Sequence, residues 1–124
     1  DRLTTNSSVV LYSTVAVKVG MPFHASVAAS KGALEGLGKS LAAELAPNTR
    51  VNVIAPSITN TPLADRFLNN ETKLEKSAQR HPLKRVGKAE DVASMTRFLL
   101  SDESSWMTGQ IIGLDGGMSS LNTH

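Results

Sequence analysis

The stretch HASVAASKGALEGLGKSLAAELAPNTRVNVIAP, residues 24–56, changes its hydrophobic period once and so predicts a helix followed by a strand. Leucines recur at helical spacing between residues 24 and 46, which predicts one apolar stripe along that helix. They are Leu34, Leu37, Leu41 and Leu45. Pro47 and Asn48 end the helix. The apolar run RVNVIAP, residues 50–56, then predicts a strand that ends at Pro56.

The segments on either side continue this alternation. SSVVLYST, residues 7–14, predicts a strand buried on both faces. Residues 57–88 are polar and interrupted by prolines, so we expect only short helices there. A helix over 89–100 and a strand over 109–115 follow. The order β-α-β-loop-α-β predicts an α/β fold with a parallel sheet, equivalent to the second half of a Rossmann-type doubly wound sheet.

The bulk composition excludes several classes of function. With 40% hydrophobic and 19% charged residues the chain is ordinary for a globular protein. A formal charge of +2 is too small to indicate nucleic-acid binding, and the absence of cysteine excludes disulfides and thiolate chemistry. No apolar run is long enough for a bilayer, and DRLTTNSS carries no signal-peptide core. We therefore expect a cytoplasmic protein with no nucleic-acid or membrane partner.

Three stretches resemble the short-chain dehydrogenase/reductase family. Residues 29–47 resemble its active-site helix, residues 50–63 its strand ending in P-G-x-x-x-T, and residues 81–118 its C-terminal signature. The family's Gly-rich T-G-x-x-x-G-x-G loop and its N-N-A-G segment do not occur in this sequence. The resemblance therefore implies that residues 1–124 form the C-terminal portion of one NAD(P)-binding Rossmann-like domain, without its N-terminal cofactor-binding half.

The family's Y-x-x-x-K motif keeps only its lysine here. Lys31 matches that lysine, which in the family lowers the pKa of the tyrosine and binds the ribose hydroxyls. Val27 stands where the tyrosine would exchange a proton with the substrate oxygen. His24 lies three residues earlier, near the same helix face, and its unperturbed pKa of about 6.5 suits a replacement acid. The alternative for His24 is a helix-start or surface histidine.

The family's substrate-orienting serine falls at Thr14, with Ser13 beside it. Either hydroxyl could keep that role, and the alternative is a side chain that bonds to local backbone at the end of the strand. The sequence does not decide between the substrate-orienting role and the structural role for either residue.

The resemblance implies that NAD or NADP binds through Lys31 and through residues after the second strand. Pro56 and Thr61 match the family's proline and carboxamide-contacting threonine. Thr59 occupies a position whose backbone contacts the carboxamide, and Ser57 replaces a glycine, which permits fewer backbone conformations. The three isolated histidines do not form a metal-binding set, so no metal is expected.

Three classes of function remain open. The first is an NAD(P)-dependent oxidoreductase that moves hydride between the cofactor and an alcohol or carbonyl substrate, atypical because the tyrosine is missing. The second is a non-catalytic relative that acts as a binding or assembly module, and the third is a small-molecule-binding α/β module. The resemblance over nearly the whole chain argues against the third, and we expect the first. The resemblance also implies that residues 62–81 form a substrate lid.

Partners follow from the same resemblance. In the family the lysine-bearing helix packs against its copy in a second subunit. Helix 24–46 carries small residues that allow such packing, which are Ala25, Ala29, Gly32 and Gly36. We expect a homo-oligomer, or an association with the chain's own N-terminal half, which would pair with the strand at 7–14.

Overall fold

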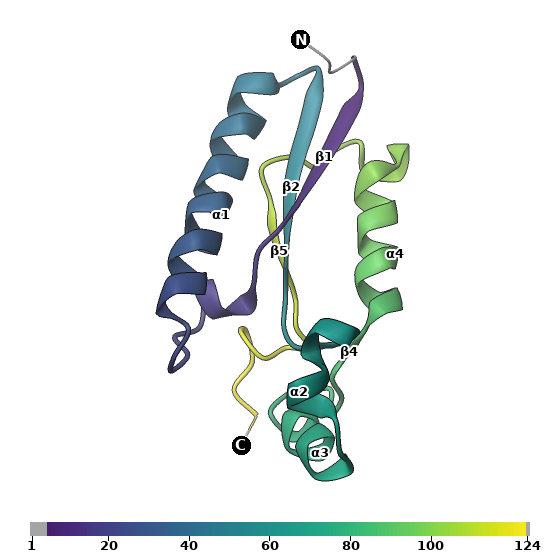
Figure 1. Ribbon diagram of the computed structural model, residues 1–124. Helices are drawn as coiled ribbons and strands as arrows, with labels where there is room; N and C mark the ends of the chain where they lie inside the picture. Colours follow the sequence, from purple (N-terminus) through teal and green to yellow (C-terminus); the bar gives the residue numbers. More distant parts are fainter. Residues whose placement is uncertain (1–4, 124) are drawn as a thin grey trace.

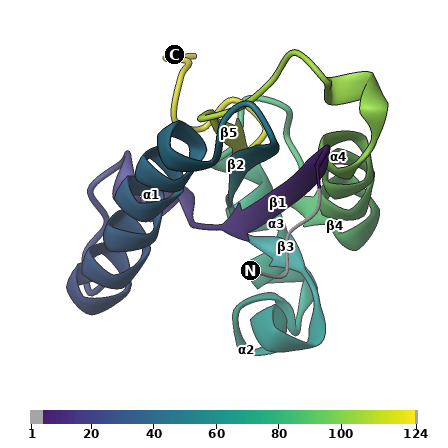
Figure 2. The same cartoon turned by 90° about the horizontal axis from the view of Figure 1, so that it is seen from above.

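A three-stranded parallel sheet forms the centre of the molecule, in a computed structural model that describes residues 5–123. The strand order is β1-β2-β5, and both pairings are parallel. One long helix, α1, covers one face of the sheet and α4 covers the other (Figure 1, Figure 2). These elements span Ser7–Tyr12 (β1), Ala25–Leu45 (α1), Thr49–Pro56 (β2), Ala89–Leu100 (α4) and Ile111–Leu114 (β5). The predicted α/β fold and element order are confirmed.

The middle strand, β2, carries the core. Val51, Val53 and Ile54 are at most 1% exposed. By contrast, no side chain of β1 is fully buried, although the sequence predicts a strand buried on both faces. That prediction is wrong because β1 lies at the edge of the described sheet, where it has one strand neighbour.

Small residues, not leucines, bring α1 close to the sheet. Gly38 and Ala42 are its buried residues, and a Cβ atom at Gly38 would lie 2.8 Å from Cγ2 of Val53. Leu37, one residue or 100° away from Gly38 around the helix, is 50% exposed. The prediction of a single inward leucine stripe therefore fails at Leu37. The glycine at 38 serves helix–strand contact.

Arg50 on β2 caps the C-terminal end of α4. Its guanidinium donates hydrogen bonds of 2.8–3.2 Å to four backbone carbonyls. The acceptors belong to Leu99, Ser101, Ser104 and Met107. A positive charge at this end also complements the helix dipole. The side chain of Leu99, which is fully buried, completes the attachment of α4 to the sheet.

Asp91 closes the N-terminal end of α4. Its carboxylate accepts a 2.8 Å hydrogen bond from the Lys88 backbone N–H and two from the Arg85 guanidinium, at 2.7 and 3.1 Å. The Arg85 hydrogen bond, then the Lys88 N–H, lower the pKa of Asp91 to about 2. The carboxylate thus stays charged at the positive end of the helix dipole.

The connection between β2 and α4 contains short elements, as predicted. Its helices are α2 (Asp65–Leu68) and α3 (Glu71–Gln79), and a two-residue parallel pairing joins β3 (Thr59–Asn60) to β4 (Gly87–Lys88). A strand of two residues is too short to produce an alternating hydrophobic pattern in the sequence. Among the described helices, none has both the length and the apolar content needed to cross a membrane.

Candidate functional site

Most of the predicted site residues lie where the parallel strands end, at the carboxyl-terminal edge of the sheet. β1 and β2 run parallel with Tyr12 opposite Ile54, so the residues that follow each strand emerge at the same edge. The Ser13 N–H donates a 2.8 Å hydrogen bond to the carbonyl of Ile54, which holds the end of β1 against β2. In open parallel sheets this edge is where ligands bind.

Lys31 reaches this edge from α1. Its ammonium donates a 3.0 Å hydrogen bond to the Tyr12 carbonyl, at the last residue of β1. The side chain is half-buried, and an ammonium carries three hydrogens. Lys31 therefore has two donors left for a ligand while its position is fixed by the strand.

The hydroxyls of Ser13 and Thr14 have different partners. Ser13 is 6% exposed and donates to Oε2 of Glu35 at 2.5 Å, with the Lys31 carbonyl a second acceptor at 3.4 Å. Its single proton is therefore held inside the protein. Oγ1 of Thr14 accepts a 3.3 Å bond from the Ala16 N–H and so caps a short 3-10 turn. An accepting hydroxyl keeps its own proton, so Thr14 is the better donor to a ligand.

The two residues before Lys31 on its helix face supply no aligned acid. Val27 is 40% exposed and carries no exchangeable proton. The His24 side chain is exposed, and its Nδ1 lies 2.7 Å from the Pro22 carbonyl. Nδ1 must therefore be the donor to that carbonyl. No hydrogen bond between described residues joins His24 to Ser13, Thr14 or Lys31.

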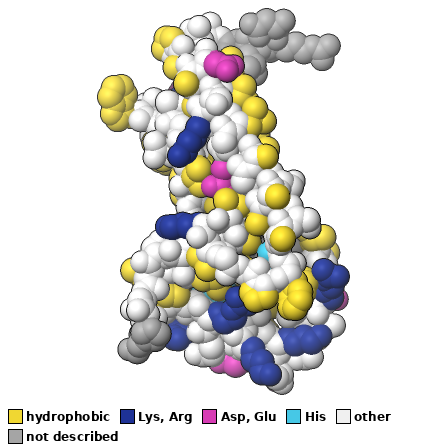
Figure 3. Space-filling view, turned by 90° about the vertical axis from the view of Figure 1, so that its left-hand side faces the viewer, with side chains coloured by type: hydrophobic (Ala, Val, Ile, Leu, Met, Phe, Trp, Pro, Cys, Tyr) yellow, Lys and Arg dark blue, Asp and Glu magenta, His cyan; other side chains and the backbone are white. Residues whose placement is uncertain are grey.

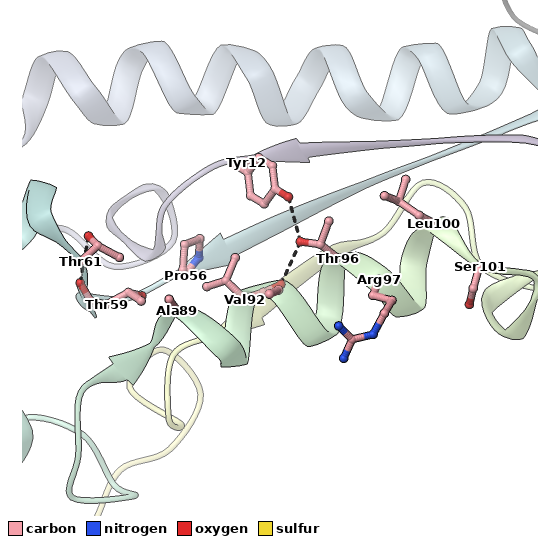
Figure 4. A pocket seen from close by; sticks show the side chains of 11 residues that line it. Tyr12, Pro56, Thr59, Thr61, Ala89, Val92, Thr96, Arg97, Leu100 and Ser101 are labelled. Atoms are coloured by element: carbon pink, nitrogen blue, oxygen red, sulfur yellow. Dashed lines mark hydrogen bonds between the residues drawn. The ribbon is translucent and has the colours of Figure 1, made fainter.

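Tyr12, the single tyrosine of the sequence, does not replace the missing acid. Its hydroxyl lies 2.8 Å from Oγ1 of Thr96, and the Thr96 hydroxyl donates to the Val92 carbonyl at 2.8 Å. Because the threonine proton is used there, Tyr12 is the donor to Thr96. Figure 4 shows the Tyr12 ring directed toward α4, away from α1.

An open groove of about 750 Å³, a size typical of ligand pockets, runs between β1, the end of β2 and α4 (Figure 4). Pro56, Thr59 and Thr61 line it at the β2 end. The Thr59 hydroxyl donates to the Ser57 carbonyl at 3.0 Å, and the Thr61 hydroxyl donates to the Thr59 carbonyl at 3.4 Å. The groove is not lined by the other predicted residues, which are Lys31, Ser13, Thr14 and His24. The predicted site residues therefore form two sets at the carboxyl-terminal edge of the sheet, one in the groove and one near the end of β1.

Ser57 replaces the family's glycine without backbone strain. The described non-glycine residues with positive φ are Asn6, Phe23 and Lys84, so Ser57 has a backbone conformation open to any residue. Its hydroxyl lies 2.8 Å from Nε2 of His81. Sequence reasoning gave His81 no role and did not identify Glu35, although Glu35 follows Lys31 by one helical turn.

Asp115 fixes the turn that follows β5. Its carboxylate accepts backbone hydrogen bonds from Gly117 at 2.9 Å and Ser119 at 3.1 Å. Burial acts to raise the pKa of Asp115, but the hydrogen bonds from Ser119 and Gly117 outweigh it and the pKa is lowered. Gly117 has φ +89, which suits glycine. The Gly116-Gly117 pair thus belongs to a turn.

Histidines and acidic residues do not form a metal site in the part of the chain that the structure describes. His124 lies outside the described residues. The available groups are the Lys31 ammonium, the Thr14 hydroxyl and the backbone around Pro56 and Thr61. These are hydrogen-bond donors and acceptors suited to ribose hydroxyls, an amide and a polarised carbonyl oxygen.

The parallel sheet and the helices on both of its faces place the chain in the Rossmann-like class of α/β proteins. Residues 1–119 match a family model described as enoyl-(acyl carrier protein) reductase. The chain is 45% identical over 114 residues to the 3-oxoacyl-[acyl-carrier-protein] reductase FabG of Thermotoga maritima, covering 91% of this chain and 46% of that protein. The chain belongs to the short-chain dehydrogenase/reductase family.

Solved structures agree with this assignment. A short-chain dehydrogenase/reductase from Brucella melitensis superposes with a TM-score of 0.87 at 37% identity, covering 94% of this chain and 46% of that one. A gluconate 5-dehydrogenase from Burkholderia cenocepacia, in complex with NADP and tartrate, superposes with a TM-score of 0.86 at 26% identity, covering 94% of this chain and 46% of that one. The chain spans about half the length of the relatives it matches.

Proposed function

We propose that this chain forms the nicotinamide-facing and substrate-facing part of an NAD(P)-dependent oxidoreductase acting on an alcohol or carbonyl compound. The observation that carries the proposal is the position of Lys31. Its ammonium is anchored to the end of β1, at the sheet edge where the segment from Pro56 to Thr61 leaves β2. A lysine with two free donors at that edge suits the hydroxyls of a ribose.

Each remaining group has a distinct task in this proposal. When bound, a nicotinamide cofactor supplies or accepts the hydride. Lys31 holds the ribose, while Pro56, Thr59 and Thr61 orient the carboxamide with backbone and hydroxyl groups. Thr14 donates its free proton in a hydrogen bond to the substrate oxygen and so polarises the carbonyl.

The proton that ends on the substrate oxygen cannot come from Val27. In this chain it comes from water at the exposed start of α1, or from Nε2 of a His24 ring that carries a proton on both nitrogens. The Nε2 atom of His24 has no partner among the described residues, and His24 is the residue immediately before the first turn of α1. Turnover without the family's tyrosine is therefore expected to be slow.

The second candidate is a non-catalytic family member that serves binding or assembly, and Val27 is the observation that favours it. The outer face of α1 carries small exposed residues, among them Ala29, Ala33 and Gly36. Figure 3 views the molecule from this side and shows mainly uncharged surface over α1, with Lys and Arg gathered toward the α2 and α3 end. This face suits packing against a second copy, while the side of β1 that faces away from β2 suits a strand from an N-terminal half.

The two candidates differ in cofactor binding by the completed domain. The test fuses the part of the Thermotoga maritima reductase that this chain does not cover to the N-terminus of this chain. Fluorescence titration with NADH and NADPH then compares Lys31→Met with Lys39→Met, a matched change at an exposed lysine of the same helix. Losing a charged hydrogen bond should weaken binding about ten- to a hundredfold for Lys31→Met alone. Equal binding by both variants would contradict the proposed role.

A further inference from the structure

His81 is a buried histidine whose two ring nitrogens are both engaged. The side chain is 2% exposed. Nδ1 lies 2.8 Å from the Ser77 carbonyl, and Nε2 lies 2.8 Å from the Ser57 hydroxyl. A buried ring held at both nitrogens has a fixed orientation.

Its partners define the direction of both hydrogen bonds. A carbonyl only accepts, so Nδ1 carries a proton and donates to Ser77. In a neutral ring Nε2 is then an acceptor, and the Ser57 hydroxyl donates to it. The other acceptor near Ser57 is the Met118 sulfur at 3.6 Å, which is a weak one. The result is a directed chain from Ser57 through His81 to Ser77.

The two hydrogen bonds of His81 join the residue that follows β2 to the end of α3. Ser57 begins the segment 57–61, called the turn 57–61 below, which contains β3 and the groove-lining residues Thr59 and Thr61. Ser77 lies in the last turn of α3. The backbone after His81 is held to the turn that follows β5, because the Leu83 N–H donates to the Gly116 carbonyl at 3.1 Å.

The rest of α3 is weakly attached. Ala78 is its one buried residue, and its other side chains are exposed or half-buried. The Lys73 ammonium bonds to Arg66 and Asn69, both in the adjoining α2 region rather than in the core. Elements with so few buried contacts open locally at low free-energy cost. The end of α3 is held by the buried Ala78 and by the hydrogen bond between His81 Nδ1 and the Ser77 carbonyl.

We propose that His81 is a positioning residue that couples the end of α3 to the groove-lining turn 57–61, acting through the Ser57 hydroxyl. When the Ser57 to His81 bond is present, the turn and the end of α3 hold one arrangement. When it is lost, both segments loosen together. The consequence for cofactor binding rests on the proposed function, whereas the coupling between the two segments does not.

Hydrogen exchange of the full chain, read by mass spectrometry, tests the coupling. Ser57→Ala removes the donor and leaves the backbone unchanged. We expect exchange to accelerate about two- to tenfold in residues 57–61 and equally in α3, as for the loss of one hydrogen bond. Ser77→Ala is the matched control, because the carbonyl that His81 contacts belongs to the backbone and is retained. Acceleration confined to 57–61, or an equal effect of Ser77→Ala on both segments, would overturn the proposal.

A second measurement compares the histidine ring of the unsubstituted chain with that of Ser57→Ala. Nitrogen-15 NMR of the histidine ring reports which nitrogen is protonated. The proposal requires that Nδ1 donates to the Ser77 carbonyl and Nε2 accepts from the Ser57 hydroxyl, so the Nε2 resonance should shift in Ser57→Ala. A proton on Nε2 alone, or an Nε2 resonance indifferent to Ser57→Ala, would show that the directed chain does not exist.

The effect on cofactor is measured separately in the fused domain. Ser57→Ala should raise the dissociation constant of NAD(P)H about two- to tenfold, with Ser77→Ala unchanged, because a looser turn must be ordered on binding. If no variant binds cofactor, the proposed function fails while the exchange result still decides the coupling. If binding is normal and Ser57→Ala leaves it unchanged, the extension of the coupling to the cofactor site is refuted.

Discussion

Replacing Val27 with tyrosine restores the missing acid at a position that the structure leaves accessible. Val27 is 40% exposed and belongs to the first turn of α1, so a larger side chain enters solvent without displacing the core. We expect a change in unfolding free energy within about 0.5 kcal/mol. Four residues separate Val27 from Lys31, which places both side chains on one helix face.

The expected gain comes from general acid–base catalysis. A positioned proton donor contributes about two to four powers of ten in rate, or roughly 2.7 to 5.4 kcal/mol of barrier. A phenol has a pKa of about 10, so it needs a nearby cation to act near neutrality. Lys31 supplies that cation one helical turn away.

The assay follows NAD(P)H consumption with a carbonyl substrate in the fused domain described above. Val27→Phe is the matched control, because it adds the same ring without the hydroxyl. Turnover should rise in Val27→Tyr and not in Val27→Phe. Equal rates for the two variants, or no gain with tyrosine, would refute the reasoning. His24→Ala in the Val27 background then shows whether His24 already acts as the acid, because this substitution lowers the turnover rate only if His24 donates the proton.

Further predictions concern stability, assembly and cofactor. Asp91 has a lowered pKa, so its contribution to the free energy of unfolding is complete above the unfolded pKa of about 3.9 and is lost as pH falls toward 2. Urea midpoints should fall across that window, and Asp91→Asn should reduce the fall without abolishing it, because the pKa of Asp115 is lowered too. Arg50→Met should lower the free energy of unfolding in urea by about 2–4 kcal/mol, because four carbonyls lose their donor. A decrease of less than about 0.5 kcal/mol would contradict the capping role. Gly36→Leu should reduce self-association in light scattering while the monomer stays folded, since a Cβ there meets nothing within 4 Å; unchanged mass would count against the α1 interface. The unfused chain should bind NAD(P)H weakly in calorimetry, and micromolar affinity would contradict this.

Elements with a strong period were predictable from the sequence. The strand around Val53 and the helix ending near Leu99 match their predicted ranges, because continuous burial and helical spacing each leave a clear pattern. The exposure of Leu37 was not predictable, since the sequence does not show which neighbour a helix face meets. The same holds for β1, whose edge position depends on what pairs with it.

The site was predictable in part. Motif spacing located Lys31 and Thr14 at the edge where β1 ends, but it could not divide the two adjacent hydroxyls between a structural and a ligand-facing use. That division depends on Glu35, 22 residues from Ser13 in sequence. The contact between Ser57 and His81, 24 residues apart, likewise depends on how β2 and the end of α3 pack. Such pairs leave no periodic signal in one sequence.

The central claim is that Lys31 and the segment after β2 form the nicotinamide end of a short-chain dehydrogenase/reductase site. A crystal structure of the fused domain with NAD(P)H tests this most directly. The account predicts the nicotinamide ribose within hydrogen-bonding distance of the Lys31 ammonium and the carboxamide against the segment from Pro56 to Thr61. A cofactor bound elsewhere, with Lys31 still bonded only to the Tyr12 carbonyl, would contradict it.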